Sequence, residues 1–214
     1  AIASTLGLGA LAIFYFDNNL QSFVISFVGI SLATAAFQAL SKAAAGEDRP
    51  GFLANFSLAF RRILFLSLFL SFLLLIFKEP IVGLLLGSGK FSPQAIQLTA
   101  SALGLFAVSI FAQAEIPLLS RAFFALQEAV RPTAIAVLSM LLNVVLSFGL
   151  VRWLTVDPRP REAVSSFLGN LNPDLPGFAL LGLPLAFSLA MIFQFSLLWF
   201  FLRKKIKSFQ KNGI

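Results

Sequence analysis

The stretch "RAFFALQEAVRPTAIAVLSMLLNVVLSFGL" (residues 121–150) joins a short charged segment to a long apolar one. Residues 133–151 contain no Asp, Glu, Lys or Arg. A helix of about 20 such residues, rising about 1.5 Å per residue, crosses a bilayer core of about 30 Å. The strands of a membrane β-barrel would instead alternate polar and apolar residues. This stretch therefore predicts a transmembrane helix that follows a tight charged hairpin.

The same pattern recurs along the chain, which is 58% hydrophobic and only 12% charged, against about 25% charged residues in soluble domains. Its apolar runs are too long for globular strands and predict six transmembrane helices in one transmembrane domain, 1–214, of an all-α polytopic membrane protein. The third run is short, and we expect its helix to end near Lys78-Glu79-Pro80, before an apolar segment that either re-enters the membrane or forms a tilted cap. The runs free of charged residues are 1–16, 18–41, 63–77, 91–114, 133–151 and 175–202.

The Lys and Arg residues predict the orientation of these helices. If the first helix runs outward, eleven of the 16 Lys and Arg residues face the cytoplasm, including those of the C-terminal tail. Residues 152–177 then form an extracytoplasmic loop, with a short helix over 162–168. The phenylalanines at 52, 56 and 60 recur every four residues, which predicts an amphipathic segment in the interface before the third span.

The composition also limits the chemistry. The chain has no cysteine and no histidine, so disulfides, thiolate nucleophiles and the usual zinc ligands are excluded. We therefore expect no catalytic residue, no metal site, no cofactor and no enzymatic activity. The net charge of +7 comes from basic residues that flank apolar runs, and this pattern favours anionic membrane lipids over nucleic acid as partners.

Two groups of charged residues are candidates for function. Glu115 lies at the end of a long apolar run, and an ionisable residue inside a span is a functional candidate by default. It could be a proton or cation site, a partner of Arg121, or a solvated group near the interface. The cytoplasmic hairpin, a candidate gating element, carries Arg121, Glu128 and Arg131, and Pro132 fits the first turn of the next helix.

The order of several motifs resembles the MurJ/MviN family of bacterial lipid II flippases. "LLLGSGKFSPQAI" and the first stretch "IASTLGLGALAIFYFDNNLQSF" are similar to family segments, as is the basic exit of the last helix. The resemblance covers nearly the whole chain, but only the C-terminal six-helix lobe of a fourteen-helix family. The hairpin residues that carry it are Arg121, Ala122, Phe123, Phe124, Ala125, Glu128, Pro132 and Asn143.

This resemblance implies an alternating-access transporter of two lobes, located in the bacterial inner membrane and handling an undecaprenyl-linked peptidoglycan precursor. The chain begins at Ala1 inside an apolar run, so we expect a missing N-terminal lobe on the same natural chain. The first two helices would line a central cavity. The alternative is that "DNN" is simply a turn between these helices, which Asx residues favour. The cavity candidates are Ser4, Tyr15, Asp17, Asn18, Asn19 and Glu115.

Two departures from the family pattern affect these expectations. The family carries Asp-Arg where this chain has Asn18-Asn19, so the role of that arginine in binding the headgroup does not pass to Asn19. The family also has prolines where Val24 and Gln38 stand, which predicts helices without breaks here. Two other functions stay open. One is a related exporter of another lipid-linked sugar or an organic cation, and the other is a non-transporting membrane scaffold for cell-wall synthesis.

Overall fold

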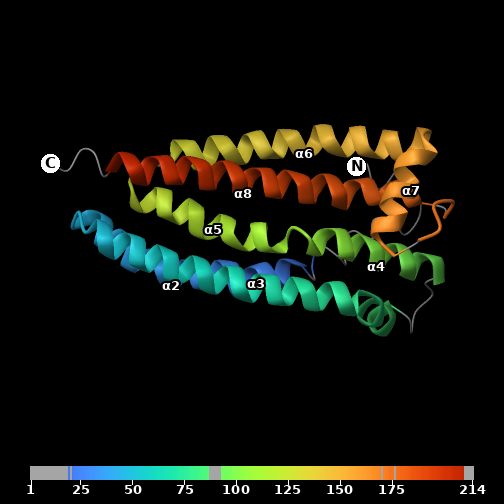
Figure 1. Cartoon of the computed structure of the whole chain (residues 1–214), viewed down its shortest axis with the longest axis horizontal. Helices are drawn as coiled ribbons and strands as arrows, with labels where there is room; N and C mark the ends of the chain where they lie inside the picture. Colours follow the sequence, from blue (N-terminus) through green and yellow to red (C-terminus); the bar gives the residue numbers. More distant parts are fainter. Residues whose placement is uncertain (1–18, 20, 87–92, 170, 176, 210–214) are drawn as a thin grey trace. The chain divides into compact units, whose positions relative to one another are not determined.

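A computed structural model describes residue 19 and residues 21–86, 93–169, 171–175 and 177–209 (Figure 1). These residues are helical wherever they are regular, and no strand occurs among them. The elements are the π-helix η2 (Ile25–Ile30), the α-helices α2 (Ser31–Ala45), α3 (Arg49–Leu86), α4 (Pro93–Ala107), α5 (Ile110–Ala125), α6 (Val130–Val156) and α7 (Pro158–Phe167), the 3-10 helix η3 (Phe178–Leu181) and α8 (Gly182–Phe209).

Four helical stretches of the described chain are long and apolar enough to cross a membrane, and α4 with α5 forms a fifth if the pair is one broken span. The all-α polytopic fold is thereby confirmed. The first expected span, 1–16, lies outside the described residues. The four single stretches are Gln21–Ala45, Arg49–Leu84, Val130–Val156 and Phe178–Ile206.

Helix α3 corrects two expectations. It is one helix of 38 residues with Pro80 inside it, so the described residues show neither a separate interfacial segment before the span nor a helix end near Lys78-Glu79-Pro80. Asp48 starts the helix directly after the turn, because its carboxylate accepts a hydrogen bond from the Gly51 N–H (3.0 Å). Pro80 removes one helical hydrogen bond, and membrane helices tolerate this loss.

The fourth span also differs from the expected run 91–114. It is interrupted at Val108 and Ser109, and α5 continues to Ala125. Both the N–H and the hydroxyl of Ser109 donate to the Phe106 carbonyl (3.0 Å each). This short local turn competes with the α-helical pattern, as serine side chains often do. Because α5 runs only from Ile110 to Ala125, Glu115 and Arg121 lie on one short helix.

The chain divides into two compact units, and α3, α6 and α8 contribute residues to both. The first unit comprises residues 1–23, 70–109 and 142–189, and the second comprises residues 24–69, 110–141 and 190–214. Each is described by itself below.

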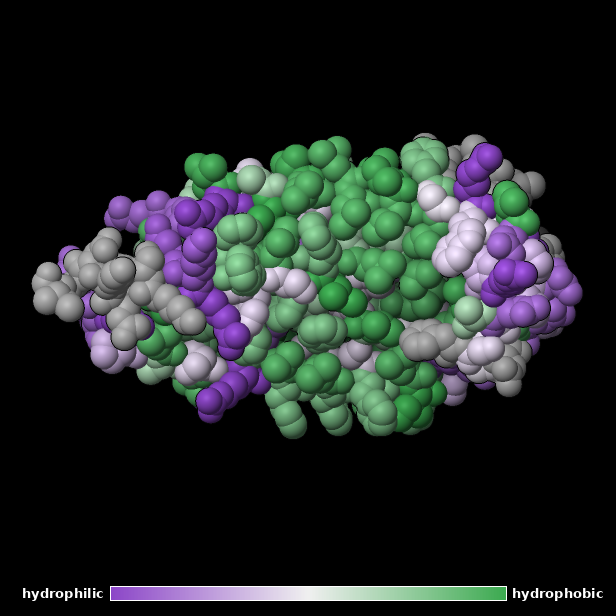
Figure 2. Space-filling view, turned by 45° about the horizontal axis from the view of Figure 1, so that its top comes forward, coloured by the Kyte–Doolittle hydropathy of each residue, from purple (hydrophilic) through white to green (hydrophobic). Residues whose placement is uncertain are grey.

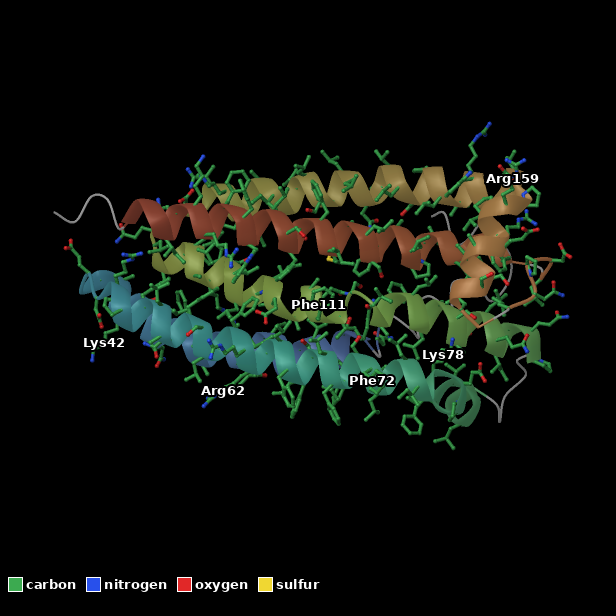
Figure 3. The ribbon with its side chains drawn as sticks, viewed as in Figure 1. Lys42, Arg62, Phe72, Lys78, Phe111 and Arg159 are labelled. Carbon is green, nitrogen blue, oxygen red and sulfur yellow. The ribbon has the colours of Figure 1, made fainter. Side chains whose placement is uncertain are left out.

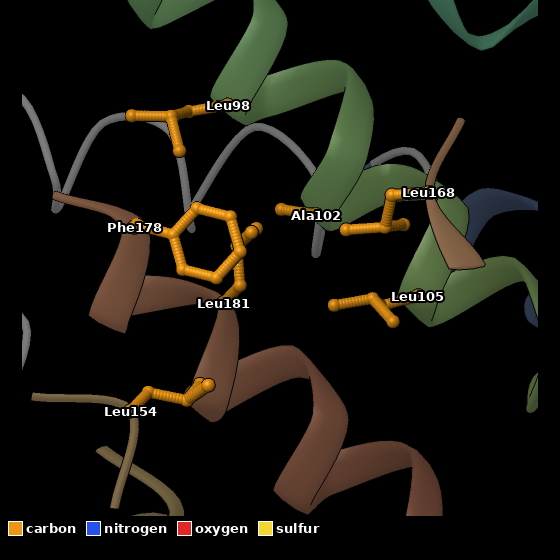
Figure 4. Close-up of a cluster of buried hydrophobic side chains, with 7 residues drawn as sticks. All are labelled: Leu98, Ala102, Leu105, Leu154, Leu168, Phe178 and Leu181. Carbon is orange, nitrogen blue, oxygen red and sulfur yellow. The ribbon is translucent and has the colours of Figure 1, made fainter. Parts of the chain in front are cut away.

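In the first unit, side chains from α4, α6, η3 and the end of α7 form a hydrophobic core (Figure 4). The Lys78 ammonium donates to the Leu168 carbonyl (3.1 Å) and so ties α3 to this core. Gly182 lies against the α6 backbone, where an added Cβ would come within 2.9 Å of the Val151 nitrogen. A glycine at the start of α8 therefore lets α8 and α6 approach closely. The core residues are Leu98, Ala102, Leu105, Leu154, Leu168, Phe178 and Leu181.

The segment 152–177 contains the expected short helix, α7. Helix α6 runs on to Val156, beyond the expected end at 151, and Asp157 caps α7 by accepting from the Arg159 N–H (3.0 Å). The Arg161 guanidinium donates to the carbonyls of Leu154 and Thr155, the second at 2.8 Å. Because these are among the last carbonyls of α6, the side chain completes the end of that helix.

Helices α3 and α6 expose many large apolar side chains. On the face shown in Figure 2, hydrophobic side chains cover a broad area and hydrophilic ones gather away from it. A protein surrounded by water would rarely expose so continuous an apolar surface, whereas lipid chains solvate it well. Exposed side chains of this kind include Phe65, Phe69, Phe72, Met140, Val145 and Phe148.

Candidate functional site

Most of the candidate cavity residues on the first two helices lie outside the described residues. Ser4, Tyr15, Asp17 and Asn18 lie outside the described residues, and Asn19 is helical and exposed. Their role in a cavity stays a prediction. The structure does describe Glu115 and the hairpin, and both lie in the second unit.

The π-helix η2 sits where the family proline is missing, just after Val24. The helix continues through this point, as the absence of proline predicted, but with a wider turn. Both the N–H and the hydroxyl of Ser31 donate to the Ser26 carbonyl, five residues back, the hydroxyl at 3.1 Å. Single π turns inside α-helices are frequent at functional sites.

Gly29 brings this wide turn into direct backbone contact with α5. A Cβ at position 29 would lie 2.6 Å from the Ala114 carbonyl oxygen and 2.8 Å from its Cα. Only glycine permits this approach, because backbone atoms cannot swing aside as a side chain can. The contact lies next to Glu115 in the sequence of α5.

Glu115 is fully buried, and its two carboxylate oxygens have no hydrogen-bond partner among the described residues. The alternative of a solvated group near the interface was therefore wrong. Pro117 follows two residues later and removes the helical hydrogen bond to the Gln113 carbonyl. An ionised carboxylate buried in this way costs several kcal/mol, about 2.5 to 3.5 or more, so the group needs a proton, a cation or a polar partner.

Arg121 does not pair with Glu115. Its guanidinium donates to the Ile30 carbonyl (3.0 Å), at the junction between η2 and α2. The ion pair with Arg121, one of the alternatives left open for Glu115, is therefore not formed, and the backbone at the end of the π turn supplies the acceptor for Arg121 instead. Arg121 thus joins α5 to the irregular part of the preceding span.

The hairpin after α5 is fixed by its own backbone. Glu128 N–H donates to the Phe123 carbonyl (3.0 Å), and Gln127 N–H donates to the Phe124 carbonyl (3.0 Å). This is the Schellman pattern that ends many helices, and it requires a left-handed residue, here Gln127 with φ of 55°. Pro132 lies in the first turn of α6, as predicted.

Glu128 connects the hairpin to α8 through charges. Its carboxylate pairs with Arg131 (Nε–Oε1 2.8 Å) and with Lys205 (Nζ–Oε2 2.9 Å). Helix α8 also meets α5 through Phe111, labelled in Figure 3, whose ring lies edge-on to Phe195 with centroids 5.8 Å apart. The hairpin and α5 therefore each contact α8, through an ion pair at Lys205 and a ring contact at Phe195.

Asn143, one of the residues that carry the family resemblance, has a hydrogen-bond partner within its own helix. Its side-chain oxygen accepts from the Ser147 hydroxyl (3.4 Å) on the same helix, α6.

Sequence reasoning missed Gly29 and Ile30, which contribute the close helix contact and the acceptor for Arg121. The available signal for the close contact was Gly29 itself, a small residue in an otherwise bulky apolar run. In the described part of the chain, no group of three or more Asp and Glu residues could hold a metal ion.

These features define a multi-pass α-helical membrane protein with a buried acid on a broken, proline-containing span. The family model described as "Lipid II flippase MurJ" matches residues 1–157. The match covers more than half of the chain, and the chain therefore belongs to the MurJ family of bacterial membrane proteins.

Curated relatives agree with this assignment. The chain is 28% identical over 141 residues to "Probable lipid II flippase MurJ" of Buchnera aphidicola subsp. Schizaphis graminum, covering 66% of this chain and 27% of the relative. It is 28% identical over 136 residues to "Lipid II flippase MurJ" of Burkholderia cenocepacia, covering 64% and 26%. For the Rhizobium meliloti relative the identity is 30% over 144 residues, covering 66% and 26%. The chain thus spans about a quarter of the length of these relatives.

Proposed function

We propose that this chain is part of a lipid II flippase, which moves an undecaprenyl-linked peptidoglycan precursor across the bacterial cytoplasmic membrane by alternating access. The charged headgroup of such a lipid cannot enter hydrocarbon, so the protein must provide a polar path that opens to one side at a time. Family membership and the apolar helices support this function. The complete machine includes a further lobe on the same natural chain, and the proposed role is transport without catalysis.

The buried Glu115 is the single observation that carries the proposal beyond family resemblance. A carboxyl group with no hydrogen-bond partner among the described residues adds nothing to stability, so a purely structural role does not explain it. It lies on α5, which is separated from α4 by a break at Val108 and Ser109 and which contains Pro117. Discontinuous helices at membrane depth are typical of the moving, substrate-handling parts of transporters.

In this proposal the headgroup path follows α5 and the first two helices. Glu115 gains and loses a proton or polar partner as the helices move. Ser4, Tyr15, Asp17, Asn18 and Asn19 supply hydrogen bonds to the sugar or diphosphate. The hairpin Arg121–Pro132 faces the cytoplasm with the C-terminal tail, because Arg131 and the basic run from Arg203 follow the positive-inside rule. Segment 152–177 is extracytoplasmic, and the Glu128 ion pairs act as a cytoplasmic gate contact.

The test replaces Glu115 by Gln in the full-length protein, in cells depleted of their own flippase. We expect at least a tenfold fall in the lipid II that reaches the outer leaflet, at unchanged membrane levels of the protein. Glu79→Gln, an equal charge change at an exposed position of α3, is the matched control and should leave translocation unchanged.

The outcomes separate the alternatives. Normal translocation by Glu115→Gln would remove Glu115 from the mechanism. A folded wild-type protein that moves no lipid II would contradict the flippase proposal itself, and movement of another lipid-linked sugar would favour the related exporter.

A non-transporting scaffold is the second candidate, and the Asn18-Asn19 pair favours it because the family arginine is missing there. If lost headgroup binding silences transport, Asn19→Arg should restore growth to flippase-deficient cells that the wild-type protein does not rescue. Rescue by the wild-type protein would exclude this candidate.

A further inference from the structure

A groove with an aromatic floor lies between the N-terminal half of α3 and the C-terminal half of α8, wholly within the second unit. Its volume is about 860 Å³, within the range of about 300–1,000 Å³ that is typical of ligand sites. None of the residues that line it is acidic, and three are arginines: Arg49, Arg61 and Arg203.

The floor of the groove is built from stacked rings. Trp199 of α8 stacks on Phe60 and Phe56 of α3, with centroids 4.7 and 6.2 Å apart. Phe56 is buried, whereas Phe60 and Trp199 keep part of their surface exposed toward the groove. The flat rings are fixed against one another, so they offer a rigid apolar surface that loses little entropy when an acyl chain covers it.

The arginines place positive charge along the same surface. Arg203 lies over the Trp199 ring, with its guanidinium carbon 4.8 Å from the centroid, and Arg61 follows directly after Phe60 on α3. Both side chains are exposed, and the salt bridges of the described residues do not include either of them. A guanidinium that lies over a ring still has N–H groups available for an anion.

The position of the groove along the helices fits the level of lipid headgroups. Tryptophan concentrates where hydrocarbon meets water, and the basic run Arg203-Lys204-Lys205 begins four residues after Trp199. On α3, Phe65 and Phe69 are exposed just beyond Arg61 and Arg62, which marks the start of the lipid-facing surface. A bound molecule would therefore meet charge at one end and apolar surface at the other.

We propose that this groove binds a membrane phospholipid with a net negative headgroup, its phosphate held by Arg61 and Arg203 and its acyl chain lying on Phe60 and Trp199. Charge complementarity favours this occupant, since all the charged residues that line the groove are cationic. The chain spans a membrane, so phospholipid is present at this surface at high concentration. The site does not depend on the identity of the transported lipid.

The experiment uses Trp199 as a local reporter. The chain contains two tryptophans, so Trp153→Phe leaves Trp199 alone. The protein is reconstituted in phosphatidylcholine vesicles to which phosphatidylglycerol or further phosphatidylcholine is added, each with bromine on its acyl chains as a quencher. We expect phosphatidylglycerol to quench Trp199 at a clearly lower mole fraction than phosphatidylcholine does.

Paired substitutions locate the charge that produces this preference. Arg61→Gln with Arg203→Gln should reduce the preference for phosphatidylglycerol by about 10- to 30-fold, since each basic residue near the surface contributes about a factor of five. Arg62→Gln with Lys204→Gln removes the same charge from the next residue of each helix, neither of which lines the groove, and should retain the preference. Arg62 points outward from α3 (Figure 3).

Three results would overturn the proposal. Equal quenching by both lipids in the wild-type background would show that no selective site exists. If neither phosphatidylglycerol nor phosphatidylcholine quenched Trp199, protein would cover the groove. An equal loss of preference in both double variants would show that general surface charge, and not this site, attracts the lipid. Because each variant is compared with itself in two lipids, altered Trp199 emission alone cannot imitate the expected result.

Discussion

The two compact units differ in one buried polar group, the carboxyl group of Glu115. In the described residues of the first unit, buried hydroxyls donate to backbone or to each other: Ser71 to the Ala107 carbonyl, Ser188 to the Leu105 carbonyl (2.8 Å), and Ser109 to Ser188 (3.0 Å). The second unit buries Glu115 without such a partner. Buried hydroxyls of the second unit also donate to backbone, as Ser139 does to the Ile135 carbonyl (2.8 Å), so the contrast lies in Glu115 alone.

Replacing Glu115 by Leu should have the largest effect and tests this contrast directly. An apolar residue of similar size removes an unsatisfied carboxyl group, so we expect the free energy of unfolding to rise by about 1–4 kcal/mol. Translocation by the full-length protein should fall at the same time. Thermal unfolding in detergent measures the first effect. A variant less stable than the wild type would mean that Glu115 has a structural partner in the folded protein, and the contrast would disappear.

Gly29→Ala should have the next largest effect. The new Cβ would lie 2.6 Å from a backbone oxygen of Ala114, so η2 and α5 must separate. We expect a loss of about 1–3 kcal/mol, the usual cost of overpacking. Gly149→Ala on α6 is the control, because its Cβ meets no atom within 4 Å and alanine favours helix by about 0.5–1 kcal/mol. Similar melting temperatures for both variants would contradict the close contact.

Ser188→Ala tests the first unit. The substitution removes a buried hydroxyl that donates to the Leu105 carbonyl and accepts from Ser109. We expect a loss of about 0.5–1.5 kcal/mol, the usual net contribution of one hydrogen bond, and no change in translocation. Ser196→Ala, an exposed serine of α8 that bonds only within its own helix, is the control and should change the melting temperature little. A large loss of transport from Ser188→Ala would place function in the first unit as well.

Glu128→Gln should have the smallest effect on stability. Its carboxylate pairs with Arg131 and Lys205 at a partly exposed position, and such pairs contribute about 0.2–1 kcal/mol each. Because salt screens these charges, the difference from the wild type should shrink at high ionic strength. Unfolding measured at low and high salt checks this. A loss that is independent of salt would indicate a packing role for the side chain.

Much of the helical layout could be predicted because it is local. The apolar run 133–151 and Pro132 mark the start of α6, and the charged residues between two runs mark the hairpin. The continuous α3 was missed because Lys78-Glu79-Pro80 looks like a helix end, although a membrane helix tolerates one proline and charges near its interface. The break at Ser109 was missed because serine in an apolar helix gives only a weak signal.

The candidate site was harder to predict. The apolar run 91–114 directly before Glu115 marked it as a functional candidate, but a solvated position near the interface stayed open. Its lack of a hydrogen-bond partner among the described residues was not visible, nor was the choice of the Ile30 carbonyl by Arg121. Both depend on η2, whose wide turn has no proline or other strong marker in the sequence.

The sequence by itself determined that this is an all-helical membrane protein, where most of its spans lie, and which connections carry the positive charge. These properties depend on the length and charge of continuous segments, which a bilayer selects one segment at a time. Only the tertiary structure decided that Gly29 meets Ala114, that Glu128 reaches Lys205, and that Phe60 and Trp199 form one surface. Such contacts join residues far apart in the chain, and their geometry depends on how neighbouring helices pack.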